Sequence, residues 1–261
     1  MAVIRNPAVA GQFYPANATQ LAATVTTLLD EAEERGEGPP KALIVPHAGY
    51  VYSGPVAASA YSLLRPYRRR YSRVVLLGPC HRVPVSGMAL STADAFRTPL
   101  GDVPVDSVAV SKIDLPGVHD VDISHQYEHS LEVHLPFLQT VLEDFSIVPI
   151  VVGDARARAV ARVLDVLWGG DETLIVVSSD LSHYLDYESA VTLDTATCRS
   201  IEQLDVHIDH NAACGATPVR GLLLAARDRD LRIVTLDLRN SGDTAGDKDF
   251  VVGYGAWMLC E

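Results

Sequence analysis

Short, uninterrupted runs of apolar residues recur along this 261-residue chain and limit the folds that it can adopt. The runs fall at Ala42–Val45, Arg73–Leu77, Ser146–Val152 and Thr173–Val177, with segments of helical periodicity between them. Uninterrupted apolar runs of this length are typical of parallel strands that are buried on both faces. Their alternation with helices predicts an α/β protein, built as a three-layer α/β/α sandwich around a central sheet.

The rest of the chain fits this architecture with two departures. Residues 86–106 carry short β-like pieces with Pro and Gly turns and predict a hairpin or similar excursion. Two further strands are expected at Arg232–Leu238 and Phe250–Leu259, and the loop between them is too short for a crossover helix, so this pair is antiparallel and the sheet is mixed. No linker-like tract is visible, so a single domain spanning 1–261 is expected. The helices are expected at Gly54–Leu64, Glu128–Leu142, Ala155–Trp168, Glu188–Leu204 and Pro218–Arg227.

Composition excludes several classes of protein. The formal net charge of −12 argues against nucleic-acid binding, because a phosphate-binding face needs a basic stripe. No apolar stretch reaches the ~20 residues of a membrane span, and the N-terminal residues do not have the pattern of a secretory signal. The four cysteines are scattered without a C-x-x-C pair, so neither a disulfide framework nor a zinc knuckle is expected. These features predict a cytoplasmic protein with reduced thiols and no membrane or nucleic-acid partner.

Polar residues that can carry chemistry follow the ends of the predicted strands. His47 comes just after the first apolar run and His81 just after the second. In open α/β sheets, ligands bind in the crevice at the carboxyl ends of the strands, so these two imidazoles form a candidate metal site. Two more polar groups follow later strands: Ser178, Ser179, Asp180 and His183, and then Asn240, Ser241, Asp243 and Asp247.

Two histidines and one carboxylate with open coordination positions suit Fe(II) or a related divalent metal. Asp243, Asp180 and Glu132 are the alternative carboxylates. His183 is our candidate for proton transfer, because the unperturbed pKa of histidine lies near neutral pH. Asp180 lies three residues before His183 and can orient its ring.

The segment HQYEHSLEVHLPF, residues 125–137, is the other dense polar region. His129 and His134 are five residues apart, about 140° around a helix, so they do not form a zincin pair. His129 and Glu132 share one helix face, and we expect them in the site wall as catalytic residues. We expect His134 to contact substrate there, with Tyr50 and Tyr52 at the rim. The residues expected to face solvent in this segment are His125 and Glu128.

Two other interpretations are weaker. SSDLSH contains the residue types of a Ser–His–Asp hydrolase, but GxSxG is absent, so no nucleophile elbow is indicated. Cys80 beside His81 could be a metal ligand or a redox thiol, although free cysteines more often pack as small buried residues.

Several motifs together give a family resemblance. PAVAGQFYP, VPHAGYVYSG, LLGPCHRV, EHSLEVHLPFL, SSDLSHY and NSGDTAGDKDFVVGYGA resemble, in order, the Memo family, known in prokaryotes as AmmeMemoRadiSam system protein B. The family is similar in fold to the LigB-type class III extradiol dioxygenases, which use non-haem iron. The resemblance implies that His47 and His81 are metal ligands, and that Asp180 and His183 share their pocket, with His183 as the acid–base residue.

The resemblance also implies a departure at the third ligand. Animal members carry a cysteine ligand in the last motif, where this chain aligns Thr244 beside Asp243. Either Asp243 substitutes as the third ligand, or the metal is weakly bound or absent. Two functions remain open. One is a metal-dependent redox enzyme that acts on an unknown small molecule. The other is a non-catalytic module that binds a peptide or protein or handles metal, and the system name implies a radical-SAM protein partner. The substrate and the oligomeric state stay open.

Overall fold

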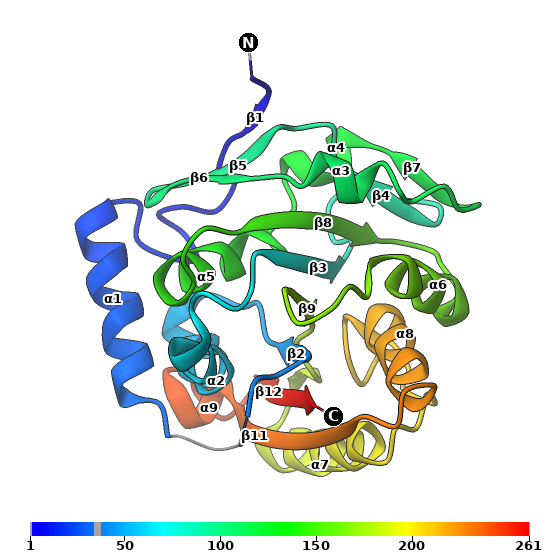
Figure 1. Ribbon diagram of the computed structural model, residues 1–261. Helices are drawn as coiled ribbons and strands as arrows, with labels where there is room; N and C mark the ends of the chain where they lie inside the picture. The colour runs from blue at the N-terminus through cyan, green and yellow to red at the C-terminus, as the bar shows by residue number, and fades with distance from the viewer. Residues whose placement is uncertain (1, 34–37, 261) are drawn as a thin grey trace.

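A wide mixed sheet forms the centre of the computed structural model, which describes residues 2–33 and 38–260 (Figure 1). In the described chain its strands run in the order β10-β12-β2-β9-β3-β8-β4-β7, and β11 pairs with β12. The middle strands β2, β9, β3 and β8 are parallel, which confirms the α/β fold predicted from their apolar runs. Their bounds are Ala42–Val45, Thr173–Ser178, Arg73–Pro79 and Ser146–Val152.

Antiparallel pairs make the sheet mixed, as expected. β11 (Arg232–Asn240) and β12 (Val251–Cys260) are antiparallel neighbours, and β12 also pairs antiparallel with β2. β10 (His183–Leu185) pairs antiparallel with the first residues of β12, Val251 and Val252. At the other edge, β4 (Met88–Leu90) is antiparallel to β8 and parallel to β7 (Val118–Asp120).

The predicted excursion at residues 86–106 divides between two sheets. β5 (Ala95–Thr98) and β6 (Gly101–Pro104) form an antiparallel hairpin, and β1 (Ile4–Arg5) adds to β5 in parallel. The first part of the excursion is β4, which extends the main sheet. The hairpin is therefore confirmed, and the N-terminal segment is its third strand.

Helices cover both faces of the main sheet, which gives the predicted three layers (Figure 1). One face is covered by α1 (Ala18–Glu31), α2 (Tyr50–Tyr61) and α5 (Leu135–Val141). The other face is covered by α6 (Ala157–Leu167), α7 (Tyr187–Glu202) and α8 (Ala216–Arg227). None of the described helices is both long enough and apolar enough to cross a membrane. Short helical segments complete the list: α3 (Ser107–Val110), α4 (Asp122–Gln126), α9 (Ser241–Thr244), η1 (Ser62–Tyr67) and η2 (Glu132–His134).

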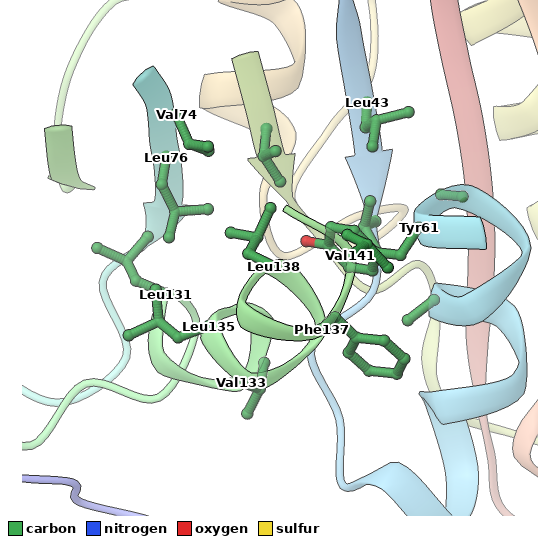
Figure 2. Packing of buried hydrophobic residues seen from close by; sticks show 14 of the residues in the cluster. Leu43, Tyr61, Val74, Leu76, Leu131, Val133, Leu135, Phe137, Leu138 and Val141 are labelled. Carbon is green, nitrogen blue, oxygen red and sulfur yellow. The ribbon is translucent and has the colours of Figure 1, made fainter. Parts of the chain in front are cut away.

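The period of two along each strand divides the core between the two faces. In β2, Leu43 and Val45 pack with α1, α2 and α5, whereas Ala42 and Ile44 pack with α6, α7 and α8. Figure 2 shows the first of these clusters, with α5 inserting apolar side chains toward β2, β3 and Tyr61 of α2. Burial on both faces explains why these strands are continuously apolar.

The predicted helix Glu128–Leu142 is wrong over its first half. The Glu128 carboxylate accepts hydrogen bonds from the backbone N–H groups of His129 and Ser130, which holds a turn instead of a helix. A 3₁₀ turn follows, and α5 begins only at Leu135, with Pro136 at its start. Proline is tolerated there because the first helical N–H groups have no partner within the helix.

Two helices also differ from the prediction, one in where it begins and one in not having been predicted. α2 begins at Tyr50, four residues before the expected start, so Pro55 lies within the helix. α1 was not predicted, although Asn17 caps it by accepting a hydrogen bond from the Gln20 N–H at 3.0 Å. An Asn cap of this kind is a usual helix start signal.

Candidate metal centre

The central strands deliver the candidate residues to one edge of the sheet. β2, β9 and β3 are parallel neighbours, with Val45 opposite Ser178 and Leu77 opposite Val177. The chain therefore leaves all three strands on the same side, just before His47, Asp180 and His81. This is the crevice at the carboxyl ends of the strands where α/β proteins bind ligands.

Three imidazoles meet in this crevice. The ring centroids of His47 and His81 are 5.1 Å apart, and the His129 ring lies 5.5 Å from that of His47 and 4.7 Å from that of His81. His129 comes from the turn before η2, as expected for the site wall. Phe13 packs against the far side of His129, with ring centroids 4.8 Å apart.

A cysteine completes this group. The Sγ atom of Cys214 lies 3.4 Å from His47 Nε2, and the ligand atoms of His47, His81 and Cys214 all lie within 4.8 Å of one another. Cys214 immediately precedes Gly215, the N-cap of α8. We did not predict it, because a cysteine without a C-x-x-C partner gives little sequence signal. Its place just before a predicted helix was the only indication that it could lie at this edge.

Burial keeps His47, His129 and Cys214 uncharged at neutral pH. Burial lowers the pKa of His47 well below its usual value, and the neighbouring His81 lowers it further. Burial lowers the pKa of His129 to about 4. Burial and the nearby Asp180 carboxyl raise the pKa of the Cys214 thiol, so the thiol is protonated. A neutral imidazole is the form that ligates a metal, and a thiol loses its proton when it does so.

Asp180 lies behind His47 in the same crevice. Its Oδ1 accepts a hydrogen bond from the His47 backbone N–H at 2.7 Å, and its Oδ2 is 4.0 Å from His47 Nε2. Burial raises the pKa of this carboxyl to about 6. Asp180 therefore fixes the loop that carries His47 and has a carboxyl group that can hold a proton close to neutral pH.

His183 stands at the start of β10, partly exposed at the same edge. It lies close enough to Asp180 and to the buried Asp194 of α7 to lower the pKa of both carboxyl groups, and within the described residues neither carboxyl group forms a hydrogen bond with its ring. The next residue, Tyr184, adopts a left-handed backbone conformation with φ of 58°. Such a conformation is uncommon outside glycine and often occurs where a local side-chain position matters.

The expectation that Glu128 and His125 face solvent is wrong. Both side chains are buried, each at most 2% exposed. Glu128 accepts hydrogen bonds from the His81 ring at Nδ1 (2.9 Å) and from the His81 backbone N–H (2.6 Å). Burial acts to raise the pKa of Glu128, but the hydrogen bonds from His81 and nearby backbone groups outweigh it and lower this pKa to about 2. His81, Glu128 and His129 form a second group with metal-ligand atoms within 4.8 Å. The Glu128 oxygens, however, already accept these hydrogen bonds.

The expectation that Glu132 is catalytic or a metal ligand is wrong. Its fully buried carboxylate forms an ion pair with Arg5 and accepts hydrogen bonds from the Tyr14 hydroxyl (2.5 Å) and the backbone N–H groups of Ala8 (2.7 Å) and Val9 (3.0 Å). Four donors occupy both oxygens. Glu132 therefore anchors the N-terminal segment to η2, away from the chemistry of the crevice.

Two of the three expected substrate contacts are also wrong. Tyr50 is buried, and its hydroxyl donates to the Val133 carbonyl at 2.6 Å within the core. His134 is 1% exposed and lies behind the metal group, bonded to the Tyr61 hydroxyl and Ser178 Oγ. Tyr52 is 40% exposed, so it is the one of the three that is free to contact a ligand.

Asp243 is placed by the structure in α9 and not beside the histidines. Its Oδ2 accepts the Asn240 backbone N–H in a capping box, and its Oδ1 accepts the Tyr187 hydroxyl at 2.7 Å. The neighbouring Thr244 donates to the Ser241 carbonyl. The structure does not bring Asp243 to the histidines as expected; the side chain that lies with His47 and His81 is Cys214.

Comparison with known proteins identifies the family. The model of the family described as "Memo-like protein" matches residues 5–258. The chain belongs to the Memo family. A MEMO1 family protein of Aquifex aeolicus is 37% identical over 96% of this chain and 97% of its own length. A second, from Aeropyrum pernix, is 39% identical over 97% of this chain and 98% of its own length. The predicted resemblance is thereby confirmed.

A solved structure shares the fold. The crystal structure of uncharacterized protein JW3007 from Escherichia coli K12 superposes with a TM-score of 0.56. It covers 84% of this chain and 100% of its own, at 14% sequence identity. At that identity the likeness concerns the fold alone, and the function of this Memo family member has to be argued from its site.

Proposed function

We propose that this Memo family protein binds a divalent transition metal, with iron(II) as the first candidate, through His47, His81 and Cys214, and that it acts as a metal-dependent redox enzyme on a small molecule. One observation carries the proposal. Three segments far apart in sequence bring two imidazole nitrogens and a thiol within 4.8 Å of one another. Cys214 also accepts a hydrogen bond from the Asp180 N–H, which holds its sulfur beside His47 Nε2.

The donor set fits a transition metal better than a hard cation. Imidazole suits iron, copper and zinc, and thiolate adds affinity for the softer of these ions. Three protein ligands leave positions open for a substrate, as catalytic sites require. A bound metal would supply Lewis acidity and, if it is iron or copper, redox chemistry.

The surrounding residues have separate tasks in this proposal. His183 lies at the exposed side of the crevice and transfers a proton to or from the substrate. Asp180, with a pKa near 6, holds the His47 loop and interacts with His183. Phe13 packs against His129, whose ring lies beside those of His47 and His81 and forms one wall of the proposed site. Tyr52 stands at the rim, where it can contact the ligand.

A metal-handling or peptide-binding module working with a radical-SAM protein is the second candidate. The thiol favours it, because a cysteine ligand suits copper(I) and zinc, which are transported and delivered as well as used in catalysis. The four free cysteines agree with a reducing compartment such as the cytoplasm.

Metal analysis tests the proposal. The protein is expressed anaerobically with iron(II), and separately with zinc and copper(I), and the bound metal is measured after gel filtration. We expect one ion per chain in the wild type and loss of metal in His47→Ala, His81→Ala and Cys214→Ala. Cys198→Ala is the matched control, since Cys198 is a buried thiol in α7 that contacts Thr235. Metal bound equally well by all four variants would contradict the proposal.

The choice of metal separates the two candidates. Preferential retention of iron, with oxygen uptake when a small-molecule library is added, supports the redox enzyme. Preferential retention of copper(I) or zinc, with transfer to a chelator and no oxygen uptake, supports metal handling.

A further inference from the structure

An oxygen atom lies at Nδ1 of each of the two imidazoles, and for His47 the other ring nitrogen, Nε2, is the one beside Cys214. His47 Nδ1 is 2.6 Å from Ser178 Oγ, and His81 Nδ1 is 2.9 Å from Glu128 Oε1. We propose that Ser178 and Glu128 are positioning residues that hold both histidines in the Nδ1–H tautomer, so that each ring presents an unprotonated Nε2 to the metal. This inference rests on the proposed metal-binding function.

The direction of the hydrogen bonds at Ser178 follows from counting its protons. The hydroxyl has one hydrogen, and it donates to the Ser130 carbonyl at 2.6 Å. Ser178 Oγ must therefore accept from His47, whose Nδ1 carries the proton. His47 Nε2 then carries no proton and can accept a hydrogen bond, which agrees with the Cys214 thiol lying 3.4 Å from it as a donor.

The chain of hydrogen bonds continues deeper into the core. His134 Nε2 lies 2.8 Å from the same Ser178 oxygen, so it is also a donor. Its Nδ1 then accepts from the Tyr61 hydroxyl at 2.9 Å. Tyr61, His134 and Ser178 are all at most 1% exposed, and His134 is neutral because burial lowers its pKa to about 3. The buried chain thus has one consistent proton order, with the His47 Nδ1 proton as its last member.

Glu128 fixes His81 in a simpler way. An ionised carboxylate only accepts hydrogen bonds, so the proton between Glu128 and His81 belongs to Nδ1 of the ring. The backbone N–H groups of His81 and Ser130 bond the same carboxylate and hold it in place. A carboxylate behind a metal-binding imidazole orients the ring and raises its basicity.

The two histidines therefore have unequal support. The acceptor behind His81 is charged, whereas the acceptor behind His47 is a neutral hydroxyl. A charged acceptor makes the stronger hydrogen bond. His81 is therefore the more tightly held ring, and His47 depends on the buried chain for its orientation.

Nuclear magnetic resonance of the metal-free protein tests the tautomers directly. Multiple-bond ¹⁵N–¹H spectra of histidine-labelled protein distinguish Nδ1–H from Nε2–H rings. We expect Nδ1–H for His47 and His81 and Nε2–H for His134. An Nε2–H form of His47 or His81 as the major species overturns the proposal. The result does not depend on metal binding: correct tautomers in a protein that binds no metal would reject the proposed function and leave the assignment of the acceptors intact.

Ser178→Ala provides the second test. Removing the acceptor oxygen shifts His47 toward the Nε2–H tautomer and lowers cobalt(II) affinity, used as the spectroscopic probe, by roughly 10–100-fold. Ser124→Ala is the matched control, since Ser124 is equally buried and its hydroxyl bonds only the Val121 carbonyl in α4. An unchanged His47 tautomer and unchanged cobalt affinity in folded Ser178→Ala overturn the proposal. If that variant does not fold, the wild-type spectra still decide the point.

Discussion

The thiol of Cys214 lies 3.4 Å from Nε2 of His47, although 167 positions separate the two residues in the chain. Cys214 is held there by its backbone N–H, which donates to the Asp180 carbonyl at 3.2 Å, and by the Asp180 N–H, which donates to its sulfur at 3.3 Å. The loop after β9 and the turn before α8 therefore hold each other, and this contact places the thiol beside His47. This contact makes Cys214 the third proposed ligand of the candidate metal centre.

Metal binding at this thiol should release a proton. Burial raises the pKa of Cys214, so its sulfur is protonated in the metal-free protein at neutral pH, and a ligating thiolate is deprotonated. We expect about one proton released per cobalt(II) ion bound at pH 7 in weakly buffered solution, measured with an indicator dye. Cys214→Ser should lose this release together with the sulfur-to-cobalt absorption. Release of no proton by the wild type would place the metal away from this sulfur.

Asp243→Asn should leave metal binding unchanged. Asp243 lies in the capping box of α9 and accepts the Tyr187 hydroxyl, so its loss affects local stability. We expect a loss of roughly 0.5–1.5 kcal/mol in unfolding free energy, the usual net contribution of a hydrogen bond, because Asn240 is the cap residue and Asp243 its partner. Metal stoichiometry and urea denaturation measure the two effects. A variant without metal but with wild-type stability would restore Asp243 as a ligand.

Glu132→Ala should be strongly destabilising. The substitution leaves Arg5 buried without its partner and removes an acceptor from Tyr14 and two backbone N–H groups. Breaking a buried pair in this way costs roughly 3–5 kcal/mol. Asp30→Ala removes the exposed partner of Arg65 and should cost less than about 1 kcal/mol. Chemical denaturation of both variants tests the difference, and equal small losses would refute the anchoring role of Glu132.

His183→Ala should keep the metal and lose proton transfer. His183 is outside the group of ligand atoms formed by His47, His81 and Cys214, so metal stoichiometry stays at the wild-type level. Once a substrate is known, turnover should fall by roughly 10²–10⁴, the usual contribution of a general acid–base residue. Metal loss in this variant would instead make His183 a ligand, and unchanged turnover would remove it from the mechanism.

His125 should make the fold sensitive to acid. Burial lowers its pKa from 6.5 to about 4, so the unfolded chain takes up a proton at a pH where the folded chain does not. Its effect is absent above pH 6.5, and stability is lost as pH falls from there to about 4, by at most roughly 3 kcal/mol. His125→Gln keeps a donor for the Ala89 carbonyl and removes the titration.

Unfolding free energies measured between pH 7 and pH 4.5 compare His125→Gln with the wild type. The variant should lose less stability across this range. His119→Gln, at an exposed position in β7, serves as the control and should follow the wild type. Parallel curves for all three proteins would show that His125 has the same pKa in the folded and unfolded chain and would refute the prediction.

The sequence by itself determined the layered α/β architecture and the edge at which the site lies. Apolar runs such as Ala42–Val45 predict buried parallel strands because burial on both faces requires them, and parallel strands end on a common edge, where His47 and His81 follow. Antiparallel pairing of β11 and β12 followed from the short loop between them.

Only the tertiary structure decided which side chains surround these histidines. Helical periodicity placed Glu132 in the site wall, but the N-terminal segment supplies Arg5 and Tyr14, which occupy its carboxylate. Glu128 turned inward because the turn at 128–131 replaced the expected helix. Cys214 gave no sequence pattern, since its position depends on where α8 begins against the end of β9. Strand burial is a local property that a periodicity records, whereas the contacts of a loop side chain depend on residues distant in sequence.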